Sequence, residues 1–65
     1  MTLIINGERQ ETAAATLAHL LETLDLGEAV VATAVNGRFV RAKDRDRTAL
    51  LEGDAVEILA PRQGG

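Results

Sequence analysis

Two Asn-Gly pairs restrict the folding of this chain more than any other feature of its sequence. Asn-Gly is the strongest two-residue signal for a β-hairpin, because both residues accept the positive φ angles of a type I′ turn. Asn6-Gly7 and Asn36-Gly37 each follow a short apolar run. The strands predicted around these turns cover residues 3–5, 8–12, 30–35 and 38–41. The charged second strand suits a sheet edge, and the third is predicted to be buried.

A single helix is predicted between the two hairpins. Leucines recur there with the i, i+3, i+4, i+7 spacing that places side chains on one helix face. The members of this stripe are Leu17, Leu20, Leu21 and Leu24. Thr16 is expected to be the N-cap, and Gly27 is expected to form the C-cap region.

A last strand is predicted near the end of the chain, where apolar and other residues alternate. Its expected inward-facing residues are Val56, Ile58 and Ala60. Gly53 and Asp54 are predicted to form the turn before this strand. Pro61 should end it, since proline cannot donate a hydrogen bond to a neighbouring strand.

The segment Arg41 to Arg47 mixes charges of both signs and is predicted to be a solvated loop or a single exposed turn. A second interpretation is a patch that steers a partner, because the segment is locally basic in an acidic protein. Leu50 and Leu51 follow it and are expected to fill the core.

The order of these elements predicts an α+β fold, in which one main helix packs on one face of a mixed sheet of about four to five strands. The first and last strands should run parallel at the sheet centre, as in a β-grasp domain. We expect this domain to cover residues 1–61 and a flexible tail ending in Gly-Gly to cover residues 62–65. A domain from a chain of 65 residues has no room for an enclosed active site.

Composition argues against several classes of function. The chain has no cysteine, which excludes disulfides and thiolate chemistry and fits a cytoplasmic location. A net charge of −3 and a single aromatic residue, Phe39, argue against nucleic-acid binding. No apolar run approaches the roughly 20 residues of a membrane-spanning helix, and no signal peptide is visible.

No catalytic residue and no metal site is predicted. His19 is expected on the helix face opposite the leucines, without a second histidine to share a metal. The carboxylates are scattered, and no pair resembles an acid–base couple. Lys43 could accept a modification, but plain solvation is the favoured interpretation.

The sequence ends PRQGG, and the unusual chemical group there is the α-carboxylate of Gly65. Glycines at positions 64 and 65 lack Cβ atoms, so this backbone could pass through a narrow cleft of a partner. A free carboxylate is a poor electrophile and must be activated, for example as an acyl-adenylate. Gly65 is therefore the candidate modified residue, and Gln63 and Gly64 are expected to give a partner access to it.

Four parts of the sequence together resemble the ThiS family of sulfur carriers, which are β-grasp relatives of ubiquitin. They are TLIINGE, TLAHLLETL, LEGDAVEIL and the terminal Gly-Gly. The resemblance implies that a ThiF-type adenylyltransferase uses ATP to adenylate Gly65. Sulfur from a cysteine desulfurase then converts Gly65 to a thiocarboxylate, and a ThiG-type thiazole synthase takes this sulfur for the thiazole of thiamine. The carrier itself is then no enzyme and binds no cofactor.

Three alternatives remain open from the sequence. The chain also resembles the small sulfur-carrier subunit of molybdopterin synthase, although that family is usually longer and richer in aromatic residues. A ubiquitin-like modifier would instead join Gly65 to a lysine of a target, and a pure interaction module would not use its tail. In each case the default docking surface is an exposed apolar patch on the sheet face opposite the helix.

Overall fold

The computed structural model describes residues 1–60. The predicted domain boundary at residue 61, with Pro61 as the end of the last strand, lies outside the described residues. So does the predicted tail, with its candidate residues Gln63, Gly64 and Gly65.

Both Asn-Gly pairs form the predicted turns. One joins β1 (Thr2–Ile5) to β2 (Glu8–Glu11), and the other joins β3 (Ala32–Val35) to β4 (Arg38–Val40). The φ angles are 51° and 83° at the first pair and 52° and 84° at the second. Positive φ at both central residues is the geometry of a type I′ turn. The local prediction is confirmed at both places.

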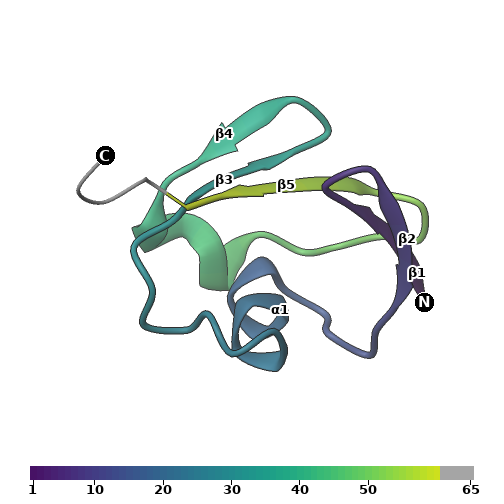
Figure 1. Ribbon diagram of the computed structural model, residues 1–65, viewed down its shortest axis with the longest axis horizontal. Coiled ribbons are helices and arrows are strands. Elements are labelled where there is room, and N and C mark those ends of the chain that lie inside the picture. The colour runs from purple at the N-terminus through teal and green to yellow at the C-terminus, as the bar shows by residue number, and fades with distance from the viewer. Residues whose placement is uncertain (61–65) are drawn as a thin grey trace.

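The final strand, β5 (Ala55–Leu59), joins the two hairpins into one sheet (Figure 1). It pairs parallel with β1 and antiparallel with β3, which gives the strand order β2-β1-β5-β3-β4. β5 is therefore the central strand, and the first and last strands are parallel neighbours as predicted. The α+β class and the β-grasp arrangement are confirmed.

The two turn asparagines also hold β5 in place with their side chains. Asn6 accepts a hydrogen bond from Ile58 N at 2.8 Å and donates one to Ile58 O at 3.1 Å. Asn36 accepts one from Ala55 N at 3.0 Å. Asparagine at these turns therefore fixes both ends of the strand that leads to the end of the chain, which glycine could not do.

Replacing Asn6 with glycine should separate the two roles of this residue. Glycine adopts the same φ, so the turn is retained, but both hydrogen bonds to Ile58 are lost. We expect the free energy of unfolding to fall by about 1–2 kcal/mol, measured by urea denaturation. Asn6→Ala should cost about 1 kcal/mol more, because alanine resists positive φ. An Asn6→Gly protein as stable as the native chain would show that the side-chain bonds contribute nothing.

Helix α1 (Leu17–Thr23) begins as predicted but ends differently. The hydroxyl of Thr16 accepts a hydrogen bond from His19 N at 3.1 Å, which confirms the N-cap. The left-handed residue after the helix is Asp25, with φ of 64°, and Leu26 N then bonds back to Leu21 O at 2.7 Å. This closure is a Schellman-type C-cap. The prediction that Gly27 forms the C-cap region is therefore wrong. The left-handed position lies two residues earlier, at Asp25, because aspartate tolerates a positive φ angle.

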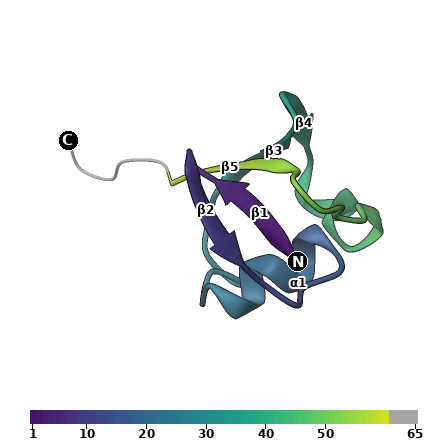
Figure 2. The same cartoon turned by 90° about the vertical axis from the view of Figure 1, so that its right-hand side faces the viewer.

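The helix and a short 3₁₀ helix, η1 (Ala42–Arg47), lie on the same side of the sheet (Figure 2). The leucine stripe of α1 packs against the inward residues of β1 and β5, and Thr33 of β3 is also buried. The buried apolar residues are Leu3, Ile5, Ala14, Leu17, Leu20, Leu21, Leu50, Val56 and Ile58. Leu24 packs at the edge of this core.

Four residues predicted to be buried are exposed, namely Val30, Ala32, Leu51 and Ala60. The third strand begins at Ala32 and not at residue 30, and the side chain of Val30 is 79% exposed. Leu50 enters the core, but Leu51 is 68% exposed because it starts the turn toward β5. Ala60 lies beyond the last residue of β5 and is also exposed.

Candidate functional site

The surface around the end of β5 is the place from which the chain continues toward Gly65. Ala60 is the last described residue, and it follows directly on β5. Leu59 pairs with Ala32 at the start of β3, so these two strand ends lie side by side. Any partner that acts on Gly65 must approach this end of the sheet, since five residues span at most about 18 Å.

An exposed apolar surface covers the sheet next to this point, on the face opposite the helix. We call it the outer-sheet patch. Its members are Val30, Ala32, Ala34, Phe39, Leu59 and Ala60. The side chains of Phe39 and Leu59 are 69% and 66% exposed. Large apolar side chains gathered on one exposed surface indicate a site of interaction.

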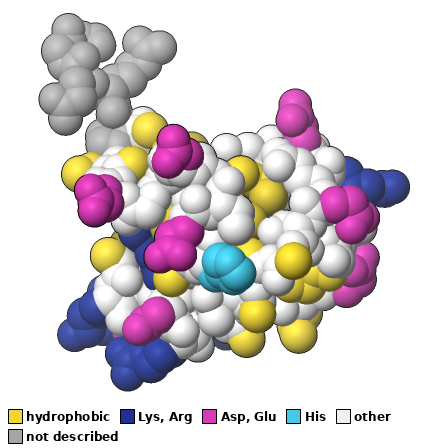
Figure 3. Space-filling model, turned by 90° about the horizontal axis from the view of Figure 1, so that it is seen from below, with side chains coloured by type: hydrophobic (Ala, Val, Ile, Leu, Met, Phe, Trp, Pro, Cys, Tyr) yellow, Lys and Arg dark blue, Asp and Glu magenta, His cyan; other side chains and the backbone are white. Residues whose placement is uncertain are grey.

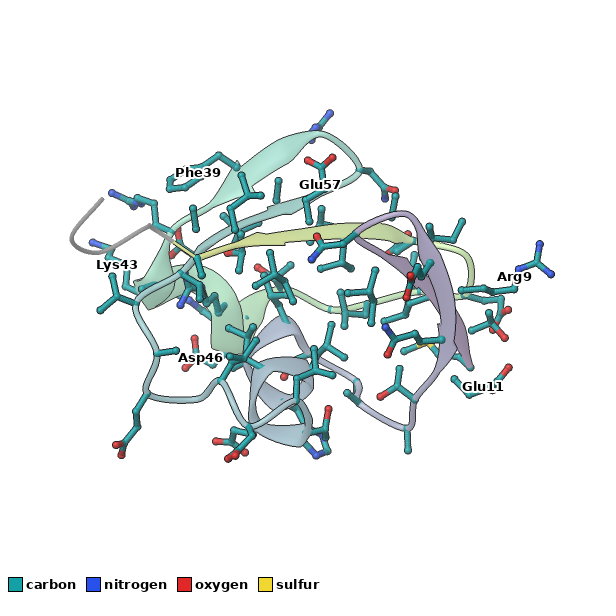
Figure 4. The ribbon with its side chains drawn as sticks, viewed as in Figure 1. Arg9, Glu11, Phe39, Lys43, Asp46 and Glu57 are labelled. Atoms are coloured by element: carbon teal, nitrogen blue, oxygen red, sulfur yellow. The ribbon has the colours of Figure 1, made fainter. Side chains whose placement is uncertain are left out.

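Two shallow hollows shape the outer-sheet patch. One, of about 290 Å³, lies between Val30 and Ala60 at the end of β5. The other, of about 90 Å³, lies between Phe39 and Leu59 and includes Glu57 in its lining. Phe39 and Glu57 rise from the same side of the sheet in Figure 4. The patch therefore combines apolar recesses with one carboxylate.

Arg45 holds the strand that carries part of this patch. Its Nη2 donates to Val31 O at 2.7 Å, and its Nε donates to the Thr33 hydroxyl at 3.1 Å. The Thr33 hydroxyl in turn donates to Val40 O at 2.8 Å. The prediction that this segment is only a solvated loop was therefore wrong at Arg45, because this side chain links η1 to β3 and β4.

The rest of the charged segment is closer to the prediction. Arg41 and Arg47 both pair with Asp44, at 3.4 and 3.0 Å, and the two arginine side chains are well exposed. Exposed ion pairs of this kind contribute little to stability. Lys43 is exposed, and Figure 4 shows it at the end of the molecule where β5 ends.

Comparisons with known proteins identify the family. The model of the ThiS family matches residues 3–65. The chain belongs to the ThiS family. The match includes the Gly-Gly end of the sequence, which confirms the resemblance stated from the sequence motifs.

Two solved structures support this assignment. The crystal structure of a thiamine biosynthesis protein (ThiS) from Geobacter metallireducens has 32% sequence identity and a TM-score of 0.83, covering 100% of both chains. A solution structure of a thiamine biosynthesis protein from the same organism has 30% identity and a TM-score of 0.81, covering 100% of this chain and 88% of that one. A search of curated protein sequences found no match.

The LEGDAVEIL stretch, one of the parts of the sequence that resemble the ThiS family, has a structural explanation in this chain. Glu52 accepts a hydrogen bond from Thr2 N at 2.9 Å, and Gly53 has a φ of 85°. Asp54 accepts bonds from Leu51 N at 2.9 Å and from Asn36 Nδ2 at 3.0 Å. Through Glu52 and Asp54 the motif thus ties the turn before β5 to both hairpins.

Within the described residues, the side chains weighed as catalytic candidates do not form a site. His19 is exposed on the helix side of the molecule, which Figure 3 shows with the histidine in cyan. Thr16 caps α1. Residues 1–60 contain no group of three or more His, Asp or Glu side chains placed to hold a metal ion. No helix in this part of the chain is long and apolar enough to cross a membrane.

The sequence missed two features of the site. The alternation along the last strand could have placed Leu59 on the face opposite the core, with Glu57 beside it. No local pattern, however, indicated that Arg45 bonds to a strand twelve residues away.

Proposed function

We propose that this chain is a sulfur carrier of thiamine biosynthesis and that its working group is the α-carboxylate of Gly65. The observation that carries the proposal is the match to the ThiS family, which extends to Gly65. The two similar structures from Geobacter metallireducens are of thiamine biosynthesis proteins. The chain is then a cosubstrate of pathway enzymes and no enzyme itself.

The proposed chemistry takes place on Gly65. A carboxylate oxygen attacks the α-phosphorus of ATP, and pyrophosphate leaves. The outer sulfur of a persulfide formed by a cysteine desulfurase then attacks the carbonyl carbon of the acyl-adenylate, and AMP leaves. A thiol next cleaves the S–S bond of the resulting acyl disulfide and is itself oxidised to a disulfide. The product is a thiocarboxylate, from which a ThiG-type thiazole synthase takes the sulfur. A ThiF-type adenylyltransferase supplies the ATP site, so the carrier needs no cofactor of its own.

The described structure supports this division of labour. The outer-sheet patch offers a docking surface beside Ala60, and Gly65 lies at most about 18 Å along the chain from that residue. A partner can therefore cover the patch and still receive Gly65 in its own active site. We propose that Gln63 and Gly64 serve this access.

Mass spectrometry of the carrier tests the proposal. We expect that incubation with a ThiF-type adenylyltransferase, ATP, a cysteine desulfurase and cysteine converts the chain to a form in which one sulfur replaces one oxygen. Tandem fragmentation should place the change on Gly65. Addition of a ThiG-type thiazole synthase and its carbohydrate substrate should return the chain to its original mass.

Other outcomes of the same experiment would contradict the proposal. Stable adducts with lysines of other proteins would indicate a modifier. Sulfur loss to a molybdopterin precursor, with none to the thiazole synthase, would indicate the molybdopterin pathway. A chain that keeps its mass with a fully active set of enzymes would indicate an interaction module.

A further inference from the structure

Glu57 is the one charged side chain on its part of the sheet. The outward positions of β3, β4 and β5, all within the described residues, are Ala32, Ala34, Phe39, Ala55, Glu57 and Leu59. Glu57 lies directly opposite Ala34, and Ala34 lies opposite Phe39. The carboxylate therefore stands on the central strand between Ala55 and Leu59, at the border of the outer-sheet patch and in the lining of its smaller hollow.

No cation of the described chain neutralises this carboxylate. The ion pairs of residues 1–60 involve Glu11 and Asp44 and do not include Glu57. Arg9 extends from the far side of the β1–β2 hairpin, away from Glu57 (Figure 4). The guanidinium of Arg45 is bonded to Val31 and Thr33 on the helix side of the sheet.

Covering the outer-sheet patch would remove Glu57 from water. Burial of an unpaired carboxylate is strongly unfavourable, and the group must gain an opposite charge or hydrogen-bond donors to remain ionised. A partner with a purely apolar surface would therefore be rejected at this position. A partner with one suitably placed cation would be accepted, so the charge discriminates between candidate partners.

We propose that Glu57 is a specificity-determining contact for the enzyme that activates Gly65. This adenylyltransferase covers the outer-sheet patch with apolar side chains and places one lysine or arginine opposite the Glu57 carboxylate. The inference rests on the proposed function. Its support is the position of the patch, because the chain continues toward Gly65 from Ala60, a member of the patch, and Glu57 lines the adjoining hollow with Phe39 and Leu59.

Binding measurements on full-length variants test this contact. The probe is the ThiF-type adenylyltransferase, titrated without ATP by isothermal calorimetry. We expect Glu57→Gln to raise Kd about tenfold and Glu57→Lys to raise it at least about a hundredfold, as for a paired charge that is removed or reversed. Glu8→Gln and Glu8→Lys are matched controls. Glu8 is exposed on the edge strand β2, and these substitutions change the net charge by the same amounts as the Glu57 substitutions. The controls should stay within about twofold of the native chain.

The dependence on salt gives a second readout that does not rely on the charge reversal. Native affinity should weaken as ionic strength rises, and Glu57→Gln should show a smaller dependence. Thermal unfolding of each variant shows whether it is folded. The proposal would be overturned if a folded Glu57→Gln protein bound with native affinity and native salt dependence. A Glu57→Lys protein with native affinity would overturn it as well. Binding of a second copy of this chain to the patch would overturn the choice of partner.

Failure of this inference can be told apart from failure of the proposed function. The native chain is assayed for adenylation of Gly65 by ATP–pyrophosphate exchange in the same experiment. A native chain that is adenylated, with Glu57 variants that bind and exchange equally well, refutes only the role of Glu57. A native chain that a fully active adenylyltransferase does not adenylate refutes the proposed function.

Discussion

Adding one alanine after Gly65 is expected to slow adenylation by at least about a hundredfold while the domain folds normally. The added residue moves the carboxylate outward by about 3.5 Å and places a Cβ beside it. Misplacement of a reacting group by about 1 Å can already cost roughly a hundredfold in rate. ATP–pyrophosphate exchange with the adenylyltransferase measures the effect.

Two controls separate chemistry from folding in this experiment. Deleting Gly64 and Gly65 should also eliminate exchange, and it should leave the melting temperature nearly unchanged because every described residue is retained. His19→Ala and Lys43→Ala should exchange within a few-fold of the native chain, since both side chains are exposed and neither lines the outer-sheet patch. Native exchange by the extended chain would show that the carboxylate of Gly65 is not the reacting group.

Leu20→Ala is expected to unfold much of the protein at room temperature. Leu20 is only 1% exposed and lies in the core between α1 and the sheet. Loss of a buried leucine side chain costs about 3–5 kcal/mol, and a domain of this size rarely has more than about 3–5 kcal/mol to lose. Circular dichroism during thermal and urea unfolding measures the change.

The neighbouring residue gives a matched control. His19 is on the same helix but exposed, so His19→Ala should change the free energy of unfolding by less than about 0.5 kcal/mol. Leu24→Ala should have an intermediate effect, because Leu24 packs only at the edge of the core. A Leu20→Ala protein as stable as the His19→Ala protein would mean that α1 does not pack on the sheet as described.

The position of the candidate site was only partly predictable. Gly65 was singled out from the sequence, because an unusual carboxylate on two glycines is visible without coordinates, and its role stays a prediction. The outer-sheet patch was expected in general terms, on the sheet face opposite the helix. Its members could not be named, because membership depends on which strands are neighbours, and strand order is not a local property.

Local sequence patterns were enough to predict the turns, the start and buried face of the helix, and the alternation of the last strand. Each of these depends on residues close in the chain, such as the positive φ of Asn6-Gly7 or the leucine spacing of α1. The tertiary structure decided that Leu50 is buried and Leu51 exposed, and that Arg45 bonds to Thr33. It also placed Glu57 opposite Ala34 in an apolar surface. The physical reason is that burial and pairing depend on which distant segments meet, and the local pattern of side chains does not contain that information.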